Sequence, residues 1–399
     1  MAALPFEEAR ALVERKLREA VRPLCFETVP LSESPGRVLG EDVFADRDYP
    51  PFPRSARDGF AVIAADVPGT LRVTGEVRAG TQFEGTVRRG ESVEIMTGAP
   101  LPSGADAVVM VEHTHMDSGF VVIEREASIG DNFNPRGSEV RMGEAVVRRG
   151  TRLDYAHVAI LAAVGCVKVP VVVRPKVAIL ATGDEIVPVD TVPGDFQIRN
   201  SNSIALAAQI ARAGGEPILL PVAPDVYEPT RALIAKGLEA DLLLLSGGVS
   251  AGKYDIVERV LADMGAEFYF DRIKIQPGQP LVFGSCSTPH GPKFFFGLPG
   301  NPTSTMVTFE AIARIAVDLL AGRQDSPLAL PYARLTNDLK QKTGLTRFLP
   351  ACVTGSEVTT EPWRGSGDMA AVARVNAFVV TEPDREFWAS GEMIRVFVR

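Results

Sequence analysis

Three clusters of glycine, small polar and acidic residues each follow an apolar run between residues 176 and 322, and they are suited to binding an anionic ligand. Glycines at a strand-to-helix turn let backbone N–H groups approach a phosphate closely. A tight turn that needs positive φ is the commoner explanation of one glycine pair, but three such turns favour a ligand cleft. The clusters contain Thr182, Gly183 and Glu185; Ser246, Gly247, Gly248 and Ser250; and Pro299, Gly300, Asn301 and Pro302.

Acidic residues accompany these turns. Two of them, Glu185 and Asp225, follow apolar runs, and Asp255 begins an expected helix. Most carboxylates in proteins simply lie exposed to solvent, which is the commoner explanation of such residues. Asp255 with Glu258 also fits a helix N-cap and its capping-box partner. Carboxylates beside a phosphate-binding turn would repel the phosphate, so we expect a divalent cation to bridge the carboxylates and the phosphate. Magnesium takes one or two carboxylates together with substrate phosphates, so we expect Mg²⁺ here.

Three further patterns are weaker. Residues 247–253 have the glycine and lysine spacing of a P-loop, but Tyr254 stands where Ser or Thr must hold magnesium, which argues against a P-loop NTPase. His113 and His115 alternate along an expected strand. Because no third ligand lies nearby in the sequence, an exposed strand face is a better explanation of this pair than a metal site. Asp58 follows a proline-rich loop, and its Asp-Gly pair alone is only a turn signal.

The elements that position these residues are indicated by apolar periodicity. Apolar runs alternate with helical patterns over residues 176–322, which predicts a parallel sheet covered on both faces. Ligands of such sheets bind beyond the carboxyl ends of the strands, where the three turns fall. Residues 4–21 predict an amphipathic helix and 154–165 a buried helix. Short strand-like runs over 46–142 and 328–399 predict a small β domain and a terminal barrel or sandwich.

Composition excludes several classes of protein. The 399 residues are 46% hydrophobic and 23% charged, as in a globular protein of several domains. A net charge of −8 would repel a phosphate backbone, so no nucleic acid partner is expected. The four cysteines form no Cys-x-x-Cys pair, which fits a reducing cytoplasm. Neither a signal peptide nor a run of about 20 apolar residues is evident, so we expect a cytoplasmic protein without a membrane span.

Six motifs in fixed order resemble those of the MoeA/gephyrin family of molybdopterin molybdenumtransferases. They are SARDGFA (55–61), TGAPLPSGADAVV (97–109), ATGDE (181–185), SGGVSAGKYD (246–255), PGQP (277–280) and GLPGNP (297–302). An SGD segment at 366–368 extends the resemblance to the last part of the chain. The resemblance implies a multidomain α/β plus β fold, with a central parallel α/β domain, a β-rich inserted domain and a small C-terminal β-barrel.

The resemblance also implies where the domains lie. Residues 1–45 and 143–173 would form one discontinuous domain, with 46–142 inserted in it. Residues 174–325 would form the α/β domain and 326–399 the barrel. Family members are elongated homodimers, and their cleft is shared between the α/β domain of one subunit and the β domain of the other.

The activity that the resemblance implies is the final step of molybdenum cofactor biosynthesis, in which molybdate and adenylylated molybdopterin yield the cofactor and AMP. The partners would be a second copy of the chain, other cofactor-biosynthesis enzymes and acceptor molybdoenzymes. The implied catalytic residues are Asp58, Glu185, Asp225 and Asp255. The implied substrate-binding residues are Thr97, Gly98, Thr182, Gly183, Ser246, Gly247, Gly248, Ser250, Lys274, Pro299, Gly300, Asn301, Pro302 and Ser366.

Within that set we expect Glu185 and Asp255 to hold Mg²⁺ at the pyrophosphate, because a cation offsets charge that develops on phosphoryl oxygens. Asp58 and Asp225 would position molybdate or its attacking oxygen.

Departures from the family pattern keep two alternatives open. Gln276 and Gln279 stand where the family usually has lysines, and neutral amides lack the Coulombic attraction of lysine for an oxyanion. Arg272 and Lys274 lie just upstream, and Asn200 stands where aspartate is common. The alternatives are a non-catalytic gephyrin-like scaffold and a pterin-nucleotide adenylyltransferase or pyrophosphatase. The four retained acids argue against the first, and the β-domain motifs around Asp58 and Thr97 argue against the second.

Overall fold

The computed structural model describes residues 2–20, 23–247, 256–289, 291–324 and 328–399. The chain divides into two compact units, one made of Met1–Thr28, Gly36–Gly40 and Pro170–Arg399, and the other of Val29–Pro35 and Glu41–Val169. The boundary between the units passes through two paired strands, β1 (Phe26–Pro30) and β12 (Lys168–Val172). The predicted fold class, a multidomain α/β plus β protein, is confirmed.

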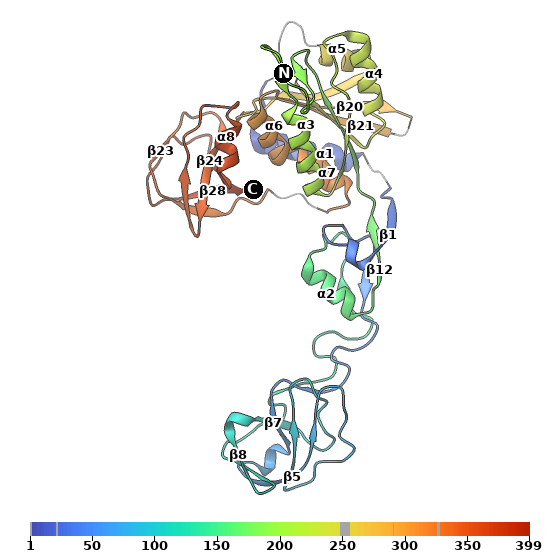
Figure 1. The fold of residues 1–399 in the computed structure, drawn as a ribbon, viewed down its shortest axis with the longest axis vertical. Coiled ribbons are helices and arrows are strands. Elements are labelled where there is room, and N and C mark those ends of the chain that lie inside the picture. The colour runs from blue at the N-terminus through green and yellow to red at the C-terminus, as the bar shows by residue number, and fades with distance from the viewer. Residues whose placement is uncertain (1, 21–22, 248–255, 290, 325–327) are drawn as a thin grey trace. The chain divides into compact units, whose positions relative to one another are not determined.

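A six-stranded sheet forms the centre of the larger unit (Figure 1). Its four parallel strands, in spatial order, are β16 (Glu216–Leu219), β13 (Lys176–Ala181), β17 (Leu242–Ser246) and β21 (Gly291–Leu298). This parallel core is as predicted. The sheet continues with two antiparallel strands, β20 (Pro280–Thr288) and β18 (Ala266–Arg272), which apolar periodicity did not separate from the parallel core.

Helices cover both faces of this sheet, which is why its strands read as continuous apolar runs. In β17, Leu242 and Leu244 pack into one core, and Leu243 and Leu245 pack into the other. The first core also receives α3 (Ser201–Ala213), α6 (Pro302–Thr308), a π-helical turn (Phe309–Ala313) and α7 (Arg314–Leu320). The second core receives α4 (Tyr227–Gly237) and α5 (Ile256–Asp263).

The N-terminal helix α1 (Phe6–Glu19) forms at the predicted place and belongs to the larger unit. Its Phe6, Ala9, Val13 and Leu17 are buried at helical spacing in the first core. The predicted domain bounds, which group residues 1–45 with 143–173, stay a prediction. The apolar stripe of α1 itself is buried against the α/β core.

The C-terminal part closes into a five-stranded barrel, as predicted. The strands pair around the ring in the order β24 (Thr346–Thr354), β25 (Glu357–Thr360), β22 (Tyr332–Leu335), β28 (Met393–Val398) and β26 (Ala377–Thr381), and β26 pairs again with β24. A short helix, α8 (Met369–Arg374), precedes β26, and β23 (Leu339–Lys340) pairs with β27 (Phe387–Trp388). An additional strand from the α/β domain, β19 (Ile275–Gln276), pairs in parallel with β24.

The smaller unit contains the predicted small β domain. Its six-stranded sheet has the order β7 (Ala107–Met110), β4 (Gly59–Val62), β6 (Glu91–Ile95), β5 (Gly69–Val77), β9 (Phe120–Ile123) and β8 (Thr114–Asp117). Short strands pair outside that sheet, β3 (Arg54–Ser55) with β10 (Phe133–Asn134) and β2 (Val43–Phe44) with β11 (Ala145–Val147). In the α/β domain, the two short strands β14 (Ile186–Val187) and β15 (Ile198–Arg199) pair in parallel.

Helix α2 (Tyr155–Ala163) is confirmed as a helix, and Asp154 forms its capping box with His157. The expected burial is wrong for the single chain, in which Leu161 is the one buried residue of this helix. Tyr155 is 88% exposed, although the helix is apolar around most of its circumference. A helix that is apolar all round needs more covering surface than this chain supplies to it.

Candidate functional site

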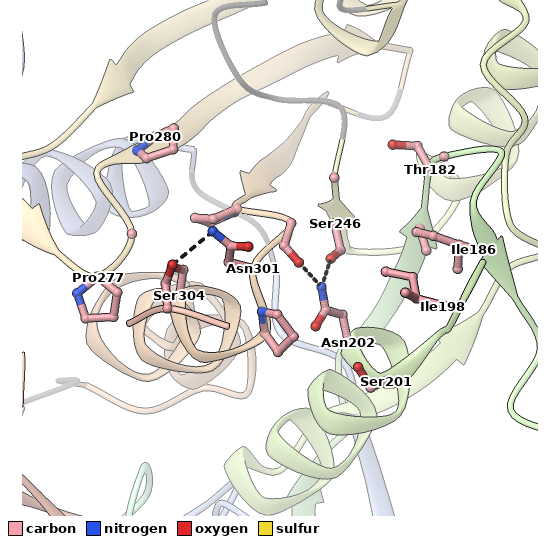
Figure 2. Close-up of a pocket in the computed structure, with 18 of the residues that line it drawn as sticks. Thr182, Ile186, Ile198, Ser201, Asn202, Ser246, Pro277, Pro280, Asn301 and Ser304 are labelled. Atoms are coloured by element: carbon pink, nitrogen blue, oxygen red, sulfur yellow. Dashed lines mark hydrogen bonds between the residues drawn. The ribbon is translucent and has the colours of Figure 1, made fainter. Parts of the chain in front are cut away.

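A cavity of about 970 Å³ lies at the carboxyl ends of β13 and β17 in the larger unit (Figure 2). The three predicted turns meet there, joined by the segment 275–280 and by a barrel loop. Among the predicted site residues, those that line it are Thr182, Gly183, Glu185, Asp225, Ser246, Gly247, Pro299, Gly300, Asn301, Pro302 and Ser366. The strand-end rule therefore located this cavity correctly.

Strand register brings the first two turns together. Ala181 lies opposite Ser246 in the parallel pair β13–β17, and Ser246 lies opposite Leu298 in β17–β21. Gly247 has φ +88°, and a Cβ there would lie 2.8 Å from the carbonyl oxygen of Thr182. A side chain at this position is therefore excluded both by backbone conformation and by contact.

Asparagine amides hold the third turn in place. Asn202 Nδ2, at the start of α3, donates to Ser246 Oγ at 3.0 Å and to the Gly300 carbonyl oxygen at 2.7 Å (Figure 2). Asn301 precedes α6 with Pro302 at the first helical position, but its side chain makes no capping bond. Instead Asn301 Nδ2 donates to Ser366 Oγ at 2.9 Å, which fixes the barrel loop to the cavity wall.

The charged residues in the described part of the lining are Glu185, Asp225 and Arg199. Burial, followed by the nearby carboxylates of Asp184 and Glu185, raises the pKa of Asp225 above its ordinary value. Arg199 is exposed, and its Nε donates to the Thr191 carbonyl oxygen at 3.0 Å. The described lining thus carries more negative than positive charge, although its turns are suited to an anion.

The barrel side of the cavity is uncharged over the described residues. Pairing of β19 with β24 sets Gln276 opposite Arg347 and brings the 276–280 turn to the cavity. Gln276 and Gln279 line it together with Leu345 and Trp363. Lys274 is exposed and lies outside the lining, so the structure does not bring this predicted binding residue to the cavity.

Asp58, Thr97 and Gly98 belong to the smaller unit. Asp58 Oδ1 accepts hydrogen bonds from the backbone N–H of Thr97 at 2.6 Å and from Thr97 Oγ1 at 2.9 Å. These bonds hold the pKa of the exposed Asp58 carboxyl below its ordinary value. Gly98 has φ +83° and turns the chain directly after Thr97. The sequence motifs around positions 58 and 97 thus form one hydrogen-bonded carboxylate site.

Several predicted residues lie outside the described part of the chain: Gly248, Ser250, Asp255 and the P-loop-like Lys253 and Tyr254. Within the described part, no group of three or more His, Cys, Asp or Glu side chains is arranged to hold a metal ion. The expectation that His113 and His115 alternate along one strand is wrong, because His113 ends a 3-10 turn (Val111–His113), where it lies beside Arg125. His115 alone is on β8, where it is exposed. Asn200 accepts a hydrogen bond from the Ser203 N–H, so it caps α3 as an aspartate would.

Sequence reasoning missed the structural role of Asn202 and the presence of Arg199, Leu345 and Trp363 in the lining. Asn202 carried a signal, because it begins the helix that follows the first turn. Leu345 and Trp363 carried none, because their place depends on how the barrel packs on the α/β domain.

No helix in the described ranges is both long and apolar enough to cross a bilayer.

Three regions of the chain match known families: residues 4–165 match the MoeA N-terminal region (domain I and II), 178–318 match a probable molybdopterin binding domain, and 332–398 match the MoeA C-terminal region (domain IV).

Curated relatives extend this similarity over nearly the whole chain. A molybdopterin molybdenumtransferase of Nostoc sp. is 34% identical over 93% of this chain and 88% of its own. One from Bacillus subtilis is 32% identical over 95% of this chain and 93% of its own. The crystal structure of the molybdopterin biosynthesis moeA protein from Pyrococcus horikoshii OT3 covers 100% of both chains, with 30% identity and a TM-score of 0.83.

The Asp58 site yields a direct prediction. Thr97→Val removes the hydroxyl donor and keeps the backbone donor, so the pKa of Asp58 should rise while staying below that of an unbonded aspartate. The shift is read from the carboxyl carbon signal of Asp58 in an NMR titration. Thr81→Val, which removes a hydroxyl bonded locally to Arg78, is the matched control and should leave the signal unchanged. An unchanged Asp58 pKa in Thr97→Val would contradict the assigned hydrogen bond.

Proposed function

The chain belongs to the MoeA family and is an enzyme of molybdenum cofactor biosynthesis, and we propose that it converts adenylylated molybdopterin and molybdate to the cofactor with release of AMP. The observation that carries this proposal is that the three turns meet in one cavity at the carboxyl edge of the sheet. Its volume of about 970 Å³ is suited to a ligand as large as a pterin nucleotide. The free cysteines of the chain support a cytoplasmic setting.

The residues at the turns would bind and orient the substrate. Backbone N–H groups and hydroxyls beside Thr182, Ser246 and Gly247 would receive its phosphates. The side-chain amides of Gln276 and Gln279 would donate hydrogen bonds, either to the uncharged part of the substrate or to the oxyanion. Neither amide is positively charged, so these donors are neutral. Asp225 and Asp58 would orient molybdate, and their surroundings shift their pKa values in opposite directions, upward for Asp225 and downward for Asp58.

Magnesium fits the charge of this site. Glu185 and Asp225 line one cavity, and their mutual repulsion with Asp184 contributes to the raised pKa of Asp225. A bound cation would reduce the repulsion between these neighbouring carboxylates. We propose that Glu185 holds Mg²⁺, together with Asp255 from the part of the chain outside the described residues. When bound, the ion would offset negative charge that develops on the phosphoryl oxygens.

We also propose that the active form is a homodimer in which Asp58 and Thr97 complete the cavity of the second copy. The exposed apolar surface of α2 supports association, because Tyr155, Ala156 and Ala159 are all exposed in the single chain. A second copy would supply the cover that α2 lacks.

The reaction is tested by incubating the purified protein with adenylylated molybdopterin, Mg²⁺ and molybdate, and by measuring AMP and active cofactor. We expect AMP release that depends on molybdate and stops when a chelator removes divalent metal. Glu185→Gln should lower the rate by on the order of 100-fold or more, since it removes a charged metal ligand. Glu216→Gln changes an exposed acid at the opposite end of β16 and should leave the rate unchanged.

Two results would contradict this proposal in different ways. AMP release without molybdate dependence would identify a pyrophosphatase. Tight binding of adenylylated molybdopterin without any turnover would identify a binding or scaffold protein.

Subunit mixing tests the shared site. Asp58→Asn and Glu185→Gln are each expected to be inactive alone. After mixing under conditions of subunit exchange, half of the dimers are mixed, and one of their two sites carries neither substitution. About a quarter of the wild-type activity should therefore return. Recovery does not occur if Asp58 acts within its own chain, and that result would contradict the shared cavity.

A further inference from the structure

Two buried hydroxyls lie at the neighbouring ends of β13 and β17 and line the cavity. Thr182 is 4% exposed and Ser246 is 1% exposed. Thr182 Oγ1 has no hydrogen-bond partner among the described residues. Leaving a buried polar group without a partner is costly, so an unpartnered hydroxyl in a residue that lines a cavity indicates a ligand group that pairs with it.

The hydrogen of the Ser246 hydroxyl is directed by Asn202. Both the hydroxyl oxygen and the Gly300 carbonyl oxygen lie within hydrogen-bond distance of Asn202 Nδ2. A carbonyl oxygen only accepts, so the atom 2.7 Å from it must be the NH₂ group of the amide and not its oxygen. Ser246 Oγ therefore accepts from Asn202, and its own hydrogen is left to donate elsewhere.

The hydroxyls of Thr182 and Ser246 are thus two O–H donors in residues that line one cavity. Within the described part of the chain, neither hydroxyl hydrogen has a protein acceptor. A phosphate oxygen is an acceptor only, and it would pair with both donors. Figure 2 shows Thr182 and Ser246 at adjacent strand ends, with Asn202 bonded to Ser246 from the side of α3.

We propose that Asn202 is a positioning residue that sets the Ser246 hydroxyl as a donor, and that Ser246 and Thr182 together bind a phosphate oxygen of the substrate. This inference rests on the proposed function for the identity of the ligand. The second bond of Asn202 restrains Gly300 next to Gly247, where a Cβ on Gly300 would lie 3.7 Å from the Gly247 Cα. One amide therefore sets both the donor direction and the spacing of the second and third turns.

The test is a double-mutant cycle on ligand affinity. Calorimetry gives the Kd of adenylylated molybdopterin without molybdate, and of pyrophosphate alone as a second probe. Asn202→Ala and Ser246→Ala should each weaken binding about tenfold. The double variant should be no more than about threefold weaker than either single variant, because Asn202 acts through Ser246. Thr182→Val, which replaces the hydroxyl by a methyl group, should weaken binding about tenfold without changing the unfolding midpoint greatly.

Gln209→Ala is the matched structural control. Gln209 lies on the same helix, and its Nε2 also donates two hydrogen bonds, to the Met306 carbonyl oxygen and to Glu310 Oε1. Its removal should leave Kd within about twofold of the wild type even where the unfolding midpoint falls. A purely structural role of Asn202 would make Gln209→Ala and Asn202→Ala alike.

Two outcomes would overturn the proposal. One is an additive double variant, about a hundredfold weaker than the wild type. The other is wild-type affinity in both Ser246→Ala and Thr182→Val while AMP release persists, which would leave the proposed function standing. Coupling seen with pyrophosphate in a protein that releases no AMP would instead uphold the positioning role and contradict the proposed function.

Discussion

Parallel pairing of β13, β17 and β21 is the constraint on which the candidate site depends. It places Ala181, Ser246 and Leu298 side by side, so the segments that follow these residues must leave the sheet at one edge. Residues more than 100 positions apart in sequence thereby meet in one cavity. The glycine at 247 is required because the turns approach each other so closely that a side chain there would contact the backbone of Thr182.

Charge gives the site its second constraint. A ligand that carries phosphates would meet Glu185 and Asp225 in a lining whose described cation is Arg199. Neutral donors, backbone N–H groups and a bridging metal ion are the ways in which such a cavity accommodates an anion. The buried hydroxyls of Thr182 and Ser246 belong to that scheme. They add donors without adding charge, so Coulombic attraction from lysine is not the only means of holding the ligand.

The sequence was most informative where burial and strand order determine structure together. Continuous apolar runs such as 242–245 predicted a covered parallel sheet, and the strand-end rule then located most of the lining. Three features depended on contacts that local pattern does not encode. The antiparallel direction of the β18–β20 and β20–β21 pairs is not encoded in the local pattern of these strands. Helix α1 packs on a core formed far along the chain, and α2 is exposed although it is apolar. Asn202 was missed for a related reason, because the role of an amide depends on which acceptors the fold brings to it.

The central claim is that the phosphates of the substrate bind at the carboxyl edge of the sheet, beside Thr182 and Ser246. A crystal structure of the protein with adenylylated molybdopterin, prepared without molybdate, tests it most directly. The account predicts a phosphate oxygen within about 3 Å of both hydroxyl oxygens, with the Asn202 amide still bonded to Ser246 and Gly300. A ligand bound in this cavity with its phosphates turned away from the two hydroxyls, or bound elsewhere on the protein, would contradict it.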